Sequence, residues 1–192
     1  MSARQLNSQV SELKSGNHDT LRELFDSHFA YLMRIAYSLT QNREVSEELV
    51  QDVFVSLWNG RANLNEDTSF NGYLNQAVKN RCYTYFRRKS DFDIVDIDDA
   101  PHSDISIMSD CNLEASDLAQ SIRVAISSLP EKTRVVFQMS REHELSYDQI
   151  AEELNISSKT VEYHMTNALK LLRESLSPLG YLSLIMTISY LW

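Results

Sequence analysis

The sequence predicts an all-α protein in which two small helical domains are joined by an acidic linker. Glycine and proline are scarce, with four Gly and three Pro in 192 residues, which disfavours a turn-rich β fold and suits long helices. Apolar residues make up 43% of the chain and recur in several segments at the spacing of an amphipathic helix. Residues 91–110 interrupt this pattern with seven Asp and no Lys, Arg or Glu, so they are predicted to separate two helical blocks.

The charge distribution and the helical patterns together predict four consecutive regions. The first helical domain covers residues 1–90, and the acidic linker covers residues 91–112. A four-helix domain with a helix-turn-helix covers residues 113–176, and an apolar tail covers residues 177–192. The formal net charge of −9 and the pI near 5.0 come mostly from the linker. Neither domain is therefore too acidic to bind nucleic acid.

The composition excludes several functional classes. Cys82 and Cys111 lack the spacing of metal ligands, and the five His are scattered, so neither a metal site nor a cofactor is predicted. No phosphate-binding loop and no GxSxG or HExxH motif is present, so an enzyme is not predicted. The first residues lack the apolar stretch of a signal peptide, and no uncharged run reaches the roughly 18–20 residues of a membrane helix. A reduced, cytoplasmic protein is the simplest prediction.

The first domain is predicted to begin with two amphipathic helices, over residues 17–42 and 45–60. The second helix has an apolar stripe on one side, and carboxylates beside further apolar groups on the other. This second side is typical of a surface that docks a basic and apolar partner, unless a third helix covers its apolar groups. The stripe consists of Val45, Leu49, Val53 and Leu57, and the other side of Glu47, Glu48, Gln51, Asp52, Phe54, Val55 and Trp58.

A third helix is predicted over residues 69–89, with Leu74, Val78 and Tyr85 in the core. Its opposite side mixes cations for phosphates with rings for base stacking, as a single-stranded nucleic-acid surface does. A basic helix end that complements the helix dipole would explain only its last three residues. The polar loop over residues 60–69 is predicted to form a small pocket. The opposite side consists of Gln76, Lys79, Asn80, Tyr83, Thr84, Phe86 and Arg87.

The second domain is predicted to contain four helices, the last two forming a helix-turn-helix. Pro130 begins the second helix at a position that favours proline, after a stripe of Leu118, Ile122, Ala125 and Leu129 in the first. Ser146-x-x-Gln149 is a capping box at the start of the third helix. Asn155 stands where a left-handed residue ends that helix, and one of the two serines at 157 and 158 caps the fourth. An ordinary helical hairpin would show the same signals.

The fourth helix divides into an apolar stripe and a polar face. Asn pairs with adenine, Thr contacts the thymine methyl, and Lys reaches guanine or phosphate, so this face predicts contact with duplex DNA. It can neutralise only about three phosphates, fewer than tight binding by the free protein requires. His164 lies on the flank, which favours a phosphate or packing role over base reading. The stripe consists of Val161, Met165, Ala168, Leu169 and Leu172, and the face of Lys159, Tyr163, Thr166, Asn167 and Lys170, bordered by Glu162 and Arg173.

Four segments follow one another along the chain: SEELVQDVFVSLW, SFNGYLNQAVKNRCYTYFRRK, LPEKTRVVFQM and LSYDQIAEELNISSKTVEYHMTNALKLLR. In order and spacing they resemble the extracytoplasmic-function (ECF) sigma factors of bacterial RNA polymerase, over about residues 10–175. The resemblance implies that the first domain binds the β′ clamp helices of core RNA polymerase and recognises and melts the promoter −10 element. It implies that the second domain recognises the −35 element as duplex. It also implies an anti-sigma factor as a partner, and no small-molecule substrate.

The resemblance, combined with the helix faces, assigns residues to each contact. The loop over residues 63–69 corresponds to the segment that holds a flipped base, and the linker to a segment that follows a basic path toward the RNA exit. Polymerase binding is expected for Glu48, Gln51, Asp52 and Phe54. Recognition and melting of the −10 element are expected for Phe70, Tyr73, Lys79, Asn80, Tyr83, Thr84 and Arg87. Recognition of the −35 element is expected for Lys159, Glu162, Tyr163, Thr166, Asn167 and Lys170.

Some features depart from the family pattern. Family members often have Arg at the positions of His164 and Asn167, so the promoter sequence is not carried over. The helix that includes Phe86 lacks some aromatic residues of strongly melting sigma factors, which predicts weak melting and a near-consensus promoter. After Pro178, an uncharged run of 14 residues extends past the usual end of the family. It is short for a membrane helix; a final packed helix, a regulatory contact and membrane contact are the alternatives.

One other function accounts for part of the sequence. A polymerase-independent helix-turn-helix transcriptional regulator that binds an operator as a dimer would explain residues 146–170. It would not explain the basic and aromatic face around Asn80. Strong, specific binding of the free protein to duplex DNA would favour this alternative.

Overall fold

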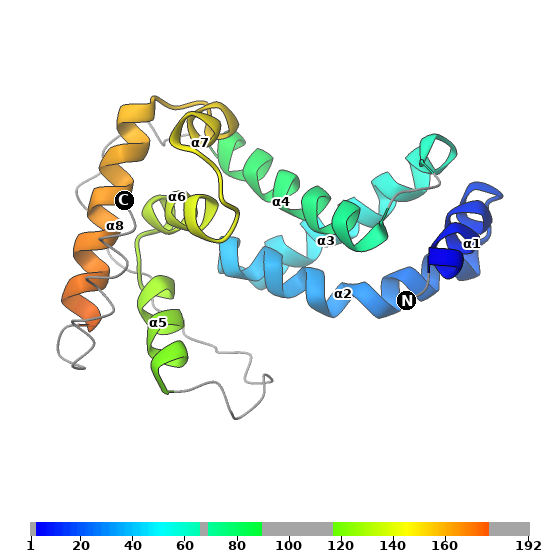
Figure 1. Cartoon of the computed structure of the whole chain (residues 1–192), viewed down its shortest axis with the longest axis horizontal. Helices are drawn as coiled ribbons and strands as arrows, with labels where there is room; N and C mark the ends of the chain where they lie inside the picture. The colour runs from blue at the N-terminus through cyan, green and yellow to red at the C-terminus, as the bar shows by residue number, and fades with distance from the viewer. Residues whose placement is uncertain (1–2, 66–68, 90–116, 177–192) are drawn as a thin grey trace. The chain divides into compact units, whose positions relative to one another are not determined.

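The computed structural model describes residues 3–65, 69–89 and 117–176, and every regular element in these ranges is helical (Figure 1). The predicted all-α class is therefore confirmed. We predicted an acidic linker over residues 91–112 and an apolar tail over residues 177–192. Both segments lie outside the described residues. In the described ranges, no helix is both long and apolar enough to span a membrane.

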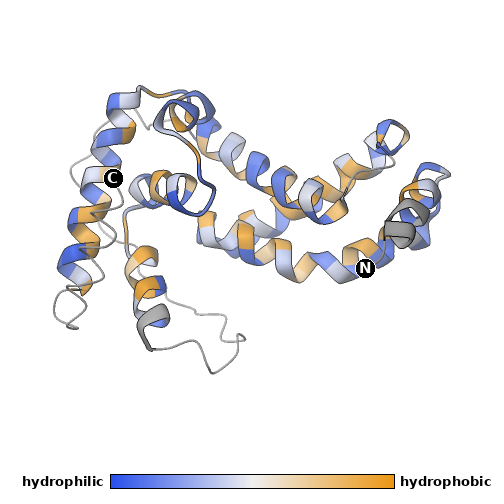
Figure 2. Cartoon of the chain, viewed as in Figure 1, coloured by the Kyte–Doolittle hydropathy of each residue, from blue (hydrophilic) through white to orange (hydrophobic). Residues whose placement is uncertain are grey.

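The chain divides into two compact units, Met1–Lys89 and Ser90–Trp192. In the first unit α2 is the central helix, because it packs against α1, α3 and α4. Apolar segments of α2, α3 and α4 gather where these helices face one another (Figure 2), and their buried side chains include Leu32, Val50 and Leu74. The elements of this unit are α1 (Ala3–Lys14), α2 (His18–Thr40), α3 (Arg43–Gly60), the 3-10 turn η1 (Arg61–Asn63) and α4 (Phe70–Arg88).

A two-residue turn joins α2 to α3. Gln41 ends α2 in the left-handed conformation, with φ 52°. Asn42 then caps α3, since its side-chain oxygen accepts a hydrogen bond from the Val45 backbone N–H at 3.0 Å. Thr40 and Ser46 lie on either side of the turn, and their buried hydroxyl oxygens are 2.8 Å apart. The turn thereby holds α2 and α3 in a fixed register.

The helix α1 is not predicted by the sequence patterns. It packs against α2 and η1, and its Val10 and Leu13 are fully buried. The Thr20 hydroxyl of α2 donates a hydrogen bond to the Glu12 carboxylate of α1 at 2.9 Å. Leu6, Val10 and Leu13 are the only large apolar residues of α1, so its apolar stripe gives a weak sequence signal.

The second unit contains the four predicted helices: α5 (Asp117–Ser127), α6 (Glu131–Arg141), α7 (Tyr147–Leu154) and α8 (Ser158–Leu176). The long helix α8 packs against each of the other three. Pro130 is the N-cap of α6, one position before the first helical position at which we predicted it. All seven residues from 133 to 139 in α6 are buried, so α6 lies inside the unit while α8 keeps one side exposed.

Candidate nucleic-acid interface

The helix α7 has the predicted signals at both ends. Ser146 and Gln149 form the capping box: the Ser146 hydroxyl oxygen accepts from the Gln149 backbone N–H at 3.3 Å, and the Gln149 side-chain oxygen accepts from the Ser146 backbone N–H at 2.9 Å. Asn155 ends the helix in the left-handed conformation, with φ 57° and ψ 48°. Asn tolerates this conformation better than most residues with a side chain. Both ends of α7 are thus fixed by local chemistry.

Two serines connect the turn to α8 in different ways. The Ser157 side-chain oxygen accepts from the Thr160 backbone N–H at 3.0 Å, so Ser157 is the residue that caps α8. The Ser158 hydroxyl instead donates a hydrogen bond to the Asp148 carboxylate of α7 at 2.7 Å. The start of α8 is therefore bonded to α7 as well as capped, and the two helices form a braced helix-turn-helix.

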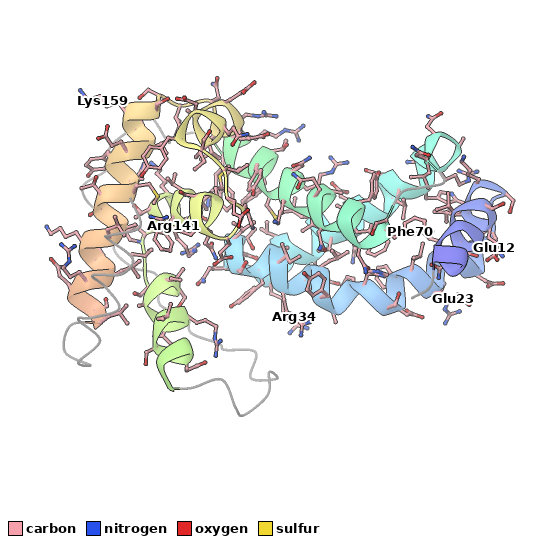
Figure 3. The ribbon with its side chains drawn as sticks, in the orientation of Figure 1. Glu12, Glu23, Arg34, Phe70, Arg141 and Lys159 are labelled. Atoms are coloured by element: carbon pink, nitrogen blue, oxygen red, sulfur yellow. The ribbon has the colours of Figure 1, made fainter. Side chains whose placement is uncertain are left out.

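The polar face of α8 is open to solvent in the described structure. Tyr163 is 43% exposed, and Lys159 lies at the start of the helix with its side chain directed outward (Figure 3). Asn167 is half-buried. The apolar stripe is buried as predicted, except for Leu169, which is half-buried. The remaining exposed members of the face are Glu162, Thr166 and Lys170.

His164 lies beneath this face and not on it. Its side chain is 5% exposed, and its Nδ1 is 3.1 Å from the Thr133 hydroxyl of α6. Its ring meets the edge of the neighbouring Tyr163 ring, with 5.5 Å between the centroids. His164 thus has a packing role, one of the two roles that its position on the flank predicts.

The charge on the α8 face is small. Lys159, Lys170 and Arg173 are exposed cations, and Glu162 is an exposed carboxylate beside them. Three cations neutralise about three phosphates, so this face gives little salt-dependent affinity by itself.

Burial raises the pKa of Tyr147 at the start of α7; Arg141 opposes this rise and Glu162 adds to it. Tyr147 therefore stays a neutral hydroxyl at neutral pH.

The exposed side of α4 carries part of the predicted −10 surface. Tyr73 is 38% exposed, Asn80 and Arg87 are exposed, and Lys79 and Thr84 are half-buried. Asn80, Thr84 and Arg87 are four and three positions apart, and Tyr73 lies two turns before Asn80, so these four share one side of the helix. A hydrogen bond from the Gln76 side-chain amide to the Asn80 side-chain oxygen, at 2.8 Å, holds the centre of this side.

Two aromatic residues predicted on that side, and a third that the resemblance assigns to the −10 element, are buried instead. Tyr83 is 2% exposed and Phe86 is 1% exposed, so the prediction that they face outward is wrong. Phe70, at the start of α4 (Figure 3), is also 1% exposed. Tyr85, predicted in the core, is half-buried, and Lys89 lies over its ring. The reason is that α4 packs against both α2 and α3, so it buries two stripes rather than one.

The first turn of α4, directly after the predicted loop, is joined to α2 by a contact that the sequence does not indicate. His28 Nε2 of α2 is 2.6 Å from the Asn71 side-chain oxygen in the first turn of α4. Within the predicted loop, Asn63 is exposed and Leu64 is buried. Residues 66–68 of the predicted pocket lie outside the described residues. The contact links residues 43 positions apart, which no local pattern predicts.

The acidic side of α3 is exposed, but its aromatic residues are not part of it. Val55 is 58% exposed. Phe54 is 5% exposed and lies against Phe25 of α2, with 4.9 Å between ring centroids, so its predicted outward position is wrong. Trp58 is half-buried, 4.3 Å from the His18 ring and 4.2 Å from the Arg61 guanidinium carbon. The sequence left open that a third helix covers these apolar groups; Phe54 is covered, but the ring that lies against it belongs to α2. The exposed carboxylates and amide are Glu47, Glu48, Gln51 and Asp52.

Comparison with known families matches both units. The family described as Sigma-70 region 2 matches residues 24–92, and the family described as Sigma-70, region 4 matches residues 119–172. The two matches stand in the order of that family and together cover well over half of the chain. The chain belongs to the sigma-70 family. It is an ECF-type alternative sigma factor, a regulatory subunit that directs transcription rather than a catalyst.

This sigma factor is similar to ECF sigma factors of other bacteria at low sequence identity. It is 22% identical over 180 residues to the ECF RNA polymerase sigma factor SigW of Bacillus subtilis, covering 89% of this chain and 96% of that protein. It is 26% identical over 164 residues to the ECF RNA polymerase sigma factor SigE of Mycolicibacterium smegmatis, covering 81% of this chain and 61% of that protein. Among solved structures, the sigma factor RpoE in complex with the anti-sigma factor NepR from Bartonella quintana matches at 20% identity and a TM-score of 0.48, over 81% of this chain and 96% of that chain.

The described part of the sigma factor contains no group of three or more His, Cys, Asp or Glu that would hold a metal ion. Cys82 of α4 is a free, buried thiol, and burial raises its pKa to about 12. Such a thiol is a poor nucleophile at neutral pH. Cys82 is therefore a core residue of the first unit.

Proposed function

We propose that this sigma factor binds core RNA polymerase through α3, recognises and melts the −10 element through α4, and recognises the −35 element as duplex DNA through α8. The polar face of α8 carries the proposal. It presents Tyr163 and Thr166 to solvent from a helix that is capped by Ser157 and bonded to α7 through Ser158. A helix braced in this way fits the major groove.

The α8 face offers distinct chemistry for bases and for phosphates. Asn167 can pair with an adenine edge, and the Thr166 methyl can contact thymine. Lys159 and Lys170 lie at the two ends of the face, where the helix leaves the groove and the phosphates are closest. Glu162 can accept a hydrogen bond from a cytosine amino group. Tyr163 adds contact area at the centre.

The α4 surface suits separated strands. Tyr73 can stack on an unpaired base, and Asn80 can bond a base edge that is free of its partner. Lys79 and Arg87 supply positive charge for the phosphates, and Thr84 lies between them. The buried Phe70 and Tyr83 support this surface from below. With a single exposed ring in this set, the surface melts DNA weakly and depends on a near-consensus promoter.

The α3 side suits a basic partner, which we take to be the β′ clamp helices of the polymerase. Glu48, Gln51 and Asp52 are exposed acceptors, and the exposed Val55 lies beside them as an apolar contact. Phe54 holds α3 against α2 and does not reach the partner. Complementary charge steers such an association and sets its orientation.

Each surface is incomplete without the others. About three phosphates bound by α8 give weak affinity, so the polymerase and the −10 contacts provide the remainder. The acidic linker is suited by its charge to a basic path in the polymerase. An anti-sigma factor is the expected regulator, and the site of action is the cytoplasm, where the polymerase works.

The proposal is tested by transcription in vitro with core polymerase on a library randomised at both promoter elements. Asn167→Ala is expected to relax the preference at one −35 position, by about 1–3 kcal/mol. Lys170→Ala is expected to weaken all promoters about equally and to lower the salt dependence.

Tyr73→Ala is expected to cost about 1–3 kcal/mol at the −10 element through lost stacking.

Asn59→Ala serves as the matched control, because Asn59 is an exposed amide at the end of α3 outside these surfaces. It should transcribe as the wild type does. Unchanged −35 preference in the Asn167→Ala protein would contradict the assignment of α8.

The complete helix-turn-helix of α7 and α8 also favours a second candidate, a regulator that binds an operator without polymerase. Gel shift of the free protein on duplex DNA separates the two. The sigma-factor proposal predicts weak, salt-sensitive binding in the absence of polymerase. Tight, specific binding of the free protein would support the regulator instead.

A further inference from the structure

A buried polar pair joins α8 to α6 beneath the reading face, by which we mean Tyr163, Thr166 and Asn167. His164 Nδ1 and the Thr133 hydroxyl oxygen are 3.1 Å apart. The two side chains are 5% and 2% exposed. Both residues belong to the second unit, in which α6 and α8 pack directly against each other. The pair is thus an internal contact of the unit that carries the reading face.

The buried stripe of α8 is otherwise apolar. Val161, Met165, Ala168 and Leu172 are all buried, and apolar contacts are non-directional. Such contacts hold a helix against its neighbour but tolerate a small rotation about its axis. A hydrogen bond between buried groups is directional and costly to leave unmade. The Ser158 to Asp148 hydrogen bond restrains the start of α8, and the pair adds a second directional restraint on rotation, beneath the reading face.

The restricted motion matters because the pair lies within one turn of the reading face. His164 directly follows Tyr163 and precedes Asn167 by three residues. A side-chain tip lies roughly 6 Å from the helix axis, so a rotation of about 10° moves it by about 1 Å. A base-edge hydrogen bond spans only about 2.7–3.2 Å between heavy atoms. A rotation of this size is enough to break it.

We propose that His164 and Thr133 are positioning residues for −35 recognition. Their hydrogen bond fixes the rotation of α8 about its axis and so determines which base edges the reading face reaches. This inference rests on the proposed function of α8 and adds two residues that do not touch DNA. It assigns α6 a part in specificity through Thr133.

Stability and positioning can be separated by the choice of variant. Removing one partner leaves a buried polar group unmatched, which destabilises the fold. Replacing both partners by apolar groups of similar shape is close to neutral for stability. The double variant Thr133→Val with His164→Leu therefore removes the directional bond while keeping the core filled. Thr133→Ser keeps the hydroxyl and serves as the conservative control.

The experiment measures the melting temperature of the full chain and its promoter preference, by transcription with core polymerase on the library randomised at both elements. The double variant is expected to melt within about 4 °C of the wild type. Its discrimination among −35 sequences is expected to fall at least about fivefold, while its −10 preference is unchanged. Thr133→Ser is expected to retain wild-type −35 discrimination.

Full −35 discrimination in the double variant would overturn the inference. So would an equal loss on every promoter, which is the result of a merely structural role. If the double variant does not fold, Thr133→Val is compared with Thr133→Ser, and equal −35 preference in these two also overturns it. A wild-type protein with no −35 preference at all would contradict the proposed function itself, which distinguishes the two failures.

Discussion

Tyr163 and His164 are consecutive aromatic residues on α8 that lie in opposite environments. Tyr163 is 43% exposed, whereas His164 is 5% exposed and lies against Thr133. One step along a helix turns a side chain by about 100°, which is enough to move it from solvent to the core. At the residue scale, DNA-facing and core side chains therefore alternate within a single turn of α8.

Cys82 gives a prediction at this scale. Burial raises the pKa of its thiol to about 12, from an ordinary value of 9.0. The folded state thus favours the protonated thiol, so its contribution to stability is complete below pH 9 and declines as the pH rises toward 12. In a Cys111→Ser variant, Cys82 is expected to react with iodoacetamide at pH 8 at least about a thousandfold more slowly than an exposed thiol.

The labelling is followed by mass spectrometry. The same variant in denaturant should label at the rate of an ordinary thiol. Rapid labelling of the folded protein at pH 8 would show that Cys82 is accessible.

At the scale of the element, α7 shows how local signals fix a short helix. It has eight residues, with a capping box at Ser146 and a left-handed Asn155 at its end. Isolated helices of this length are unstable in water, so α7 depends on the burial of Ile150 and Leu154 in the core as well as on the caps at its two ends. The hydrogen bond from Ser158 to Asp148 then fixes the start of α8 against α7.

Alanine substitutions at both ends of α7 should lower the stability, whereas glycine at the second end should not. Ser146→Ala removes the cap and is expected to cost about 1 kcal/mol. Asn155→Ala places a β-carbon in the left-handed region and is expected to cost about 1–2 kcal/mol. Asn155→Gly keeps that conformation accessible and should leave the stability nearly unchanged.

These changes are measured by urea unfolding of the full chain. Glu152→Ala is the control, because Glu152 is exposed in the same helix. Equal stability of the Asn155→Ala and Asn155→Gly proteins would contradict the role given to the left-handed turn.

The helix α4 shows where a sequence pattern is insufficient. Its apolar period predicts one core stripe through Leu74 and Val78, and both residues are buried. The further burial of Tyr83 and Phe86 comes from packing against both α2 and α3. A helical wheel shows how the side chains of one helix are distributed, but it does not show how many other helices pack against it. The same limit applies to Phe54, which Phe25 of α2 contacts.

At the scale of the whole molecule, each unit has its own core. In the first unit α2 is central, and in the second α8 contacts every other helix. We therefore expect residues 1–89 and residues 90–192, each produced alone, to unfold cooperatively on heating. Circular dichroism at 222 nm checks this, and the full chain should show two components. A fragment 1–89 without a cooperative transition would contradict the independence of the units.

The sequence by itself determined the all-α class, the family and the order of the helices in both units apart from α1, because these depend on local periodicity, caps and motifs within single segments of the chain. It also determined the polar face of α8, where one stripe is packed and the other is open. Only the tertiary structure decided that Phe54, Phe70 and Tyr83 are buried, that α1 covers α2, and that His164 meets Thr133. These facts depend on contacts between residues far apart in the chain, and burial is set by the number of neighbouring elements rather than by the residue type.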